Sequence, residues 1–128
     1  MKSENKILQM SFDFALQIVD LYKISIGQKE FILSKQLLRS GTSVGANVEE
    51  AIAAQSRKDF ISKMSIASKE ARETRYWIRL LEKSKLVDID YSFCFANSEH
   101  IINILTKTVK TTQEKSHNNS KFIIQNSK

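Results

Sequence analysis

The chain has 128 residues, no proline, three glycines and one cysteine, with a formal net charge of +6 at pH 7. One cysteine excludes an intrachain disulfide and is typical of a reducing compartment, and no apolar run approaches the ~18 residues that a membrane span needs. We therefore expect one domain of a cytoplasmic protein that starts without a secretory signal.

Residues 4–24 predict a first helix, because apolar and small side chains recur at intervals of three and four residues. Phe12 and Leu21 lie off the centre of this line, which indicates a second buried edge. A turn at Ser25–Lys29, around Gly27, precedes a second helix expected over residues 30–55. The line in the first helix comprises Ile7, Leu8, Ser11, Phe14, Ala15, Ile18, Val19 and Tyr22.

The stretch Leu38–Ala51 holds Gly41 and Gly45, four residues apart, within an apolar line of helical spacing. Glycine inside a helix costs ~1 kcal/mol relative to alanine. Two glycines on the buried side therefore indicate that another backbone approaches closely there. The alternative is a loop, since Ser-Gly is a common helix breaker.

A third helix is predicted from Ser56 to about Lys83. Ser56 and Asp59 resemble a capping box in front of Phe60. Residues 56–86 carry nine Lys and Arg against four Asp and Glu, so nearly all of the excess charge lies here. The expected core face comprises Phe60, Met64, Ala67, Ala71, Thr74, Ile78 and Leu81.

Five basic residues of this third helix fall on one neighbouring face and form the candidate nucleic-acid site. Like charges three or four residues apart destabilise an isolated helix by roughly 0.2–0.5 kcal/mol per pair. A helix that retains them is expected to bind an anion, unless acids of other helices or subunits neutralise them or water solvates them. These residues are Lys69, Arg72, Arg75, Arg79 and Lys83.

Ile66, Trp77 and Leu80 form a further apolar strip on the third helix, away from its core face. One bundle cannot bury two faces of the same helix, so the strip predicts a subunit interface. Tryptophan is a frequent anchor of such interfaces. The alternative is that Trp77 packs on the edge of its own bundle. Phe12 and Leu21 of the first helix could contribute to the same interface.

A short connection at residues 84–87 leads to a fourth helix, capped by Asp88 or Asp90 and expected to end near Lys115. Four long helices with short links predict an all-α, antiparallel up-down-up-down four-helix bundle over residues 1–115. Residues 116–128 are predicted to be a polar, flexible tail. Its apolar cluster, residues 122–124, either docks on a partner or has no role.

Catalytic chemistry has little support in the sequence. There are two histidines and one cysteine, without a phosphate-binding loop, a dinucleotide fingerprint or a triad order. One Glu-x-x-His motif, Glu114 to His117, is half of what a di-metal bundle needs. Glu49 and Glu50 diverge by about 100° on a helix and cannot easily share a proton. We therefore expect no catalytic residue, no metal and no cofactor.

The segments RSGTSVGANVEEA and SRKDFISKMSIASKEARE resemble the four-helix-bundle family of proteins encoded in intervening sequences of bacterial 23S rRNA genes. The similarity runs from Leu33 to Leu81, and it includes Gly41, Gly45, Asn47 and Glu49 or Glu50 of an Ala-Asn-x-x-Glu pattern. Relatives include the accessory protein of diversity-generating retroelements. The resemblance implies a ring of identical subunits, typically a pentamer.

Residues and resemblance together predict a non-catalytic homo-oligomer that binds RNA or DNA without sequence specificity. The alternative is a structural or adaptor protein that binds a protein partner, such as the reverse transcriptase bound by the retroelement relatives. Asn47 is expected to be a satisfied polar group rather than a catalytic residue.

Overall fold

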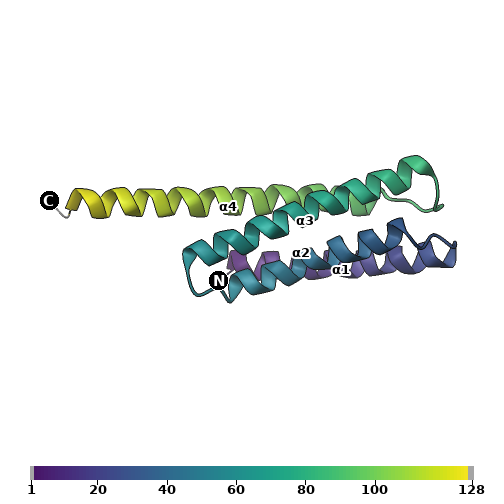
Figure 1. Ribbon diagram of the computed structural model, residues 1–128, viewed down its shortest axis with the longest axis horizontal. Helices are drawn as coiled ribbons and strands as arrows, with labels where there is room; N and C mark the ends of the chain where they lie inside the picture. Colours follow the sequence, from purple (N-terminus) through teal and green to yellow (C-terminus); the bar gives the residue numbers. More distant parts are fainter. Residues whose placement is uncertain (1, 127–128) are drawn as a thin grey trace.

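The computed structural model describes the backbone of residues 2–126 and the side chains of residues 4–118. The described chain is all-α and contains no strand. Successive helices run in opposite directions along one long axis (Figure 1), so the predicted four-helix bundle is confirmed. The helices are α1 (Lys2–Gly27), α2 (Leu33–Ile52), α3 (Arg57–Ser84) and α4 (Ser92–Asn126).

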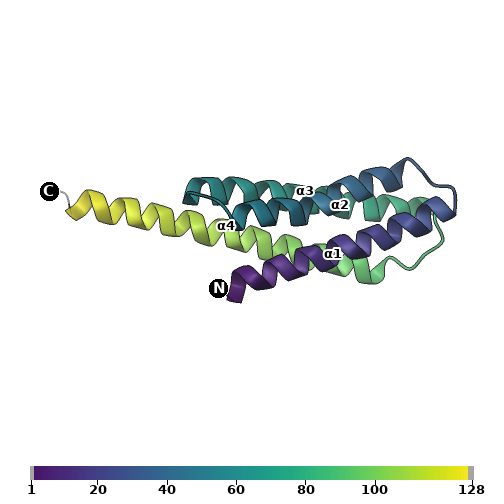
Figure 2. The same ribbon diagram turned by 90° about the horizontal axis from the view of Figure 1, so that it is seen from below.

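The helices follow the order α1, α2, α3, α4 around the bundle, with α2 and α3 in the most extensive contact. α1 and α4 close the bundle over a shorter stretch and cross at an angle (Figure 2). The outer face of α1 and α2 therefore lies opposite the outer face of α3 and α4. None of the helices in residues 2–126 combines the length and apolar character needed to cross a bilayer.

α4 is longer than predicted. The expected end near Lys115 is wrong, because the helix continues to Asn126 and projects beyond the rest of the bundle (Figure 1). The segment after Lys115 contains no glycine or proline, the residues that most often end a helix. The boundary of a separate tail at residue 116 stays a prediction, and the side chains of residues 122–124 lie outside the described part.

Side-chain caps define three of the helix starts. The carboxylate of Glu30 accepts the backbone N–H groups of Leu33 at 2.9 Å and Ser34 at 2.7 Å, so α2 begins after Glu30 rather than at it. Partial burial raises the pKa of Glu30, but these N–H donors outweigh burial and hold the pKa below its usual range. The Ser56 hydroxyl accepts the Asp59 N–H at 3.0 Å, as the capping motif predicted. Asp90 caps Ser92 in the same way.

Large apolar side chains from all four helices fill the core, among them Phe14, Leu37, Met64 and Leu105. Six of the seven residues predicted for the α3 core face are buried, and Phe60 is partly buried. Leu21 is also buried, with 7% of its surface exposed, so its suggested contribution to a subunit interface is wrong. Helix geometry places Leu21 on the same side of α1 as the buried residues Phe14 and Ile18, rather than on an outer edge.

Gly41 and Gly45 lie in α2 at its contact with α1, which confirms the helix and excludes the loop. A Cβ atom on Gly41 would come within 2.7 Å of Cγ1 and Cγ2 of Ile18. A Cβ atom on Gly45 would lie 3.3 Å from the backbone oxygen of Ser11. The close approach is thus to a branched side chain at Gly41 and to the α1 backbone at Gly45.

Gly41→Leu is expected to lower the free energy of unfolding by ~1–3 kcal/mol, because the new side chain overpacks the contact with Ile18. Ala96→Leu is the control, since Ala96 is exposed on α4, away from this contact. Thermal and urea melts of both variants measure the difference. Equal stability of wild type and Gly41→Leu would contradict the close contact.

Candidate nucleic-acid interface

The structure separates the charges of α3 onto two sides. Two of the predicted basic residues reach towards α4: the guanidinium of Arg72 donates to the Thr106 hydroxyl at 3.2 Å, and Arg75 lies 3.8 Å from the Glu99 carboxylate. These contacts place Arg72 and Arg75 on the α4 side of α3. Because Arg75 remains partly exposed, its single weak ion pair leaves most of the local positive charge uncompensated.

The other three basic residues, Lys69, Arg79 and Lys83, are exposed. No ion pair to any of them occurs among the described side chains. With Arg72 and Arg75 they extend over about 21 Å of helix, at 1.5 Å per residue. We call these five residues the basic face.

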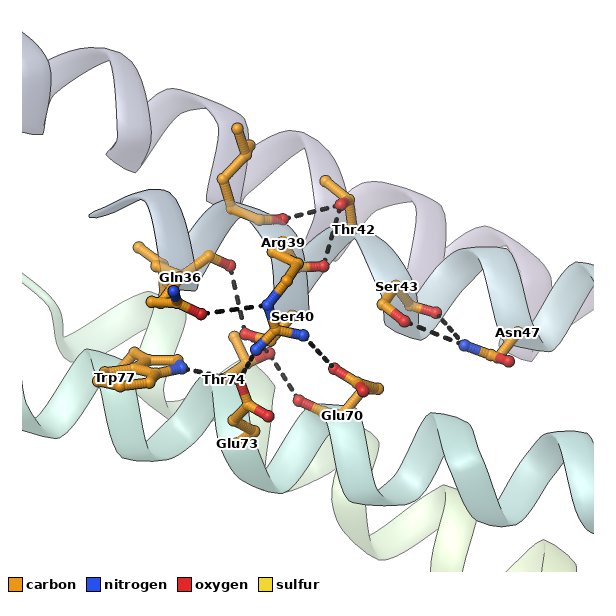
Figure 3. A network of polar contacts seen from close by, with 12 residues as sticks. Gln36, Arg39, Ser40, Thr42, Ser43, Asn47, Glu70, Glu73, Thr74 and Trp77 are labelled. Atoms are coloured by element: carbon orange, nitrogen blue, oxygen red, sulfur yellow. Dashed lines mark hydrogen bonds and ion pairs between the residues drawn. The ribbon is translucent and has the colours of Figure 1, made fainter. Parts of the chain in front are cut away.

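Two of the four acids of α3, Glu70 and Glu73, lie on its opposite side, where α2 neutralises them, whereas Glu82 lies beside Tyr91 near the start of α4. Arg39 of α2 forms ion pairs with Glu70 and Glu73 (Figure 3), the first at 3.4 Å. The predicted alternative, that acids of neighbouring helices neutralise the basic face, therefore holds only for Arg75. Glu70 and Glu73 instead turn towards Arg39.

α4 adds a basic residue that sequence analysis missed. A shallow groove between α3 and α4 is lined by Arg72 and Lys110 together with the hydroxyl groups of Ser65, Ser68 and Thr106. Guanidinium, ammonium and hydroxyl donors are the groups that contact phosphate oxygens. The sequence could not reveal Lys110, because the four Lys residues of α4 are scattered around the helix and its α3-facing side is not evident without the partner helix.

The predicted interface strip lies on the α2 side of α3. Trp77 is only partly exposed and packs against the core. Its indole N–H donates to Glu73 at 3.0 Å (Figure 3), and its ring meets that of Tyr76 edge-on with centroids 5.0 Å apart. Ile66 is 38% exposed and Leu80 partly exposed. Trp77 thus packs partly on its own bundle, and the strip keeps an outward apolar surface.

The Ala-Asn-x-x-Glu pattern around Asn47 makes structural contacts in this chain. The Asn47 amide donates to the Ser43 carbonyl at 2.9 Å and to the Ser43 hydroxyl at 3.0 Å (Figure 3). Glu50 pairs with Lys63 of α3 at 3.3 Å. Asn47 thus bonds within α2, whereas Gly41 and Gly45 contact α1 and Glu50 contacts α3. Their side chains do not converge on one point as a catalytic site requires.

Neither the Cys94 thiol nor the His100 imidazole belongs to a cluster of reactive side chains. Cys94 is buried, and burial raises the pKa of its thiol to about 12, so the thiol is neutral near pH 7. His100 lies beside Asp13, Gln17 and Asn97 at a small cavity between α1 and α4. Among the described side chains, no three His, Cys, Asp or Glu residues gather as metal ligands.

Comparison with known proteins shows the family to which the chain belongs. The profile of the 23S rRNA-intervening sequence protein family matches residues 3–118. A crystal structure of a protein of unknown function from the S23 ribosomal protein family of Bacteroides thetaiotaomicron is similar, with 46% sequence identity and a TM-score of 0.80. The similarity covers 84% of this chain and 98% of that one. No curated protein matches the chain.

Proposed function

Because this chain belongs to the 23S rRNA-intervening sequence protein family, a premise that fixes its fold, we propose that it is a non-catalytic homo-oligomer that binds RNA or DNA through its basic face. The observation that carries the proposal is the charge separation on α3. Glu70 and Glu73 face Arg39 of α2, whereas Arg72 and Arg75 contact α4 and the other three basic residues are exposed. The proposed location is the cytoplasm, which suits a single buried thiol.

The mechanism is contact with phosphates rather than reading of bases. Double-stranded DNA carries a phosphate about every 3.4 Å along each strand, so a basic face about 21 Å long can follow about six of them. Arg72 and Lys110 line the groove beside α4, while Lys69, Arg79 and Lys83 project from the exposed surface. Such contacts bind without sequence preference, and their affinity falls as salt rises.

Assembly strengthens the same mechanism. Each subunit of a homo-oligomer brings one basic face, and several faces on one nucleic acid raise the effective affinity without any new contact. The partly exposed strip of Ile66, Trp77 and Leu80 supports assembly, because it leaves an apolar surface that the bundle itself does not cover.

Titration of labelled RNA and DNA at 50 and 200 mM salt tests the proposal. Binding is expected at the lower salt, with an affinity that falls at least tenfold at the higher salt. A pull-down treated with nuclease tests the alternative role as an adaptor, which the outward apolar residues of α1 and α3 favour. No binding at 50 mM salt, together with a protein partner that survives nuclease, would replace the proposal with the adaptor.

A further inference from the structure

α1 carries a second line of apolar side chains outside the core, which we call the α1 stripe. Its members recur at alternating intervals of four and three residues, the spacing of a coiled-coil seam. Phe12 is 58% exposed and Ile26 is 36% exposed, while the others are partly exposed. No charged residue interrupts the line. The stripe comprises Leu8, Phe12, Ala15, Val19, Tyr22 and Ile26.

The stripe lies on the outer face shared by α1 and α2. Ser11 and Ile18 of α1 contact α2, whereas Asp13 and Gln17 face α4. Helix geometry places the stripe beyond the α2-facing side and away from α4. α2 presents small side chains next to it, among them the exposed Ala46. A helix from another molecule could therefore pack closely beside the projecting Phe12.

We propose that the α1 stripe is the surface on which a second copy of this chain seats its α3 strip of Ile66, Trp77 and Leu80. The inference rests on the proposed homo-oligomer and identifies the missing half of its interface. The stripe lies on the outer face of α1 and α2, and the α3 strip lies on the adjoining face of α2 and α3. Two different surfaces on one chain produce a head-to-tail contact.

The two surfaces match in length and height. The stripe extends over about 27 Å from Leu8 to Ile26, and the α3 strip over about 21 Å from Ile66 to Leu80. Ile18 lies against Gly41, and the neighbouring Ser40 bonds Thr74, so these residues of α1, α2 and α3 share one height in the bundle. α1 and α3 run in the same direction (Figure 1), so copies side by side would align the two surfaces without sliding.

Charges on the α2 side of the α3 strip complement those beside the stripe. Lys23 and Lys35 border the stripe, and neither forms an ion pair among the described side chains. On the α2 side of the α3 strip, Glu70 and Glu73 exceed Arg39 by one negative charge, whereas Lys69 borders the strip on its other side.

Lys63 lies beside the α3 strip. It is near the height of Glu49 of α2, and Glu49 borders the end of the α1 stripe opposite to Lys23 and Lys35. These charges favour contact between the α1 stripe of one copy and the α2 side of the α3 strip of another. Contact of two α3 strips would instead bring Glu73 of each copy together, which like-charge repulsion disfavours.

Two variants test the proposal by complementation. The double variant Phe12→Asp/Ile26→Asp disables the stripe, and Ile66→Asp/Trp77→Ala disables the α3 strip. Each is expected to be monomeric alone by light scattering, because each lacks half of the contact. Their equimolar mixture is expected to form a heterodimer and stop there, since only one intact pair of surfaces remains.

A mixture that stays monomeric, or a variant that keeps the wild-type mass, would overturn the proposal. Circular dichroism checks that both variants are folded. A monomeric wild type would instead remove the proposed homo-oligomer itself, while RNA titration measures the nucleic-acid proposal separately.

A second measurement needs no variant. Carbodiimide cross-linking of mixed ¹⁵N-labelled and unlabelled wild-type protein identifies intermolecular bonds by their mixed isotopes. The expected cross-links join Glu70 or Glu73 of one copy to Lys23 or Lys35 of another. Mixed-isotope cross-links confined to α3 pairs or to α1 pairs would overturn the head-to-tail contact.

Discussion

Trp77→Ala is expected to weaken assembly by about 2 kcal/mol or more, which corresponds to a roughly 30-fold higher Kd. The indole offers the largest apolar surface of the α3 strip, and its N–H already has a partner in Glu73. Its burial in an interface would therefore leave no unsatisfied donor. Helix content should remain nearly unchanged, because Glu73 keeps its ion pair with Arg39.

Light scattering coupled to size exclusion measures this effect at micromolar concentration. Wild type is expected as a closed oligomer, with a mass near five chains of 14.7 kDa for the ring that the sequence resemblance implied. Phe93→Ala is the matched control, since Phe93 is 70% exposed on α4 and away from the proposed contact. An oligomer that ignores Trp77→Ala would contradict the placement of the interface.

Neutralising Lys69, Arg79 and Lys83 to glutamine is expected to lower nucleic-acid affinity by roughly 10–100-fold at low salt. These residues are exposed and without ion pairs among the described side chains, so their loss should not destabilise the bundle. The slope of log affinity against log salt should fall by about 0.7–0.9 for each phosphate contact removed.

A control with the same change of charge separates the face from the net charge. Lys6, Lys29 and Lys107 are exposed elsewhere on the bundle, and their replacement by glutamine also removes three charges. This control should lose much less affinity, because long-range charge contributes less than direct contact. Equal losses in both triple variants would show that no particular face binds.

Most of the fold could be predicted from local patterns. Recurrence of apolar residues at three and four positions located Met64, Ala71 and Ile78 in the core, because a helix core face is determined by its own sequence. The capping motif at Ser56 likewise acts within one turn. The glycines of α2 indicated a close approach, although only the structure shows that Gly41 meets a side chain and Gly45 a backbone.

The wrong and missed features have two causes. Some positions depend on a helix that is remote in the sequence, and the end of α4 is not marked by a residue that terminates a helix. α4 continues past Lys115 because no residue there terminates a helix. The positions of Glu73 and Lys110 depend on Arg39 and on α3, respectively, and each partner is remote in the sequence. Periodicity places a side chain on a helix face but does not say which helix covers that face.

The α1 stripe illustrates the same limit. Its residues Leu8, Ala15, Val19 and Tyr22 were assigned to one line with the core residues Phe14 and Ile18, because the two lines are adjacent on the helix. Only the position of α2 divides them into an inner and an outer line. A periodic apolar pattern broader than one contact can therefore contain both a core and an interface.

The central claim, that assembly presents several basic faces to one nucleic acid, is tested most directly by comparing RNA affinity in assembled and dissociated protein. Wild type and an uncharged variant, Ile66→Ser/Trp77→Ala, carry the same charges and the same basic face and differ in the α3 strip. At 50 mM salt the dissociated variant is expected to bind a long RNA at least 100-fold more weakly, because multivalent binding is lost. Equal affinity of monomer and oligomer for the same RNA would contradict the claim.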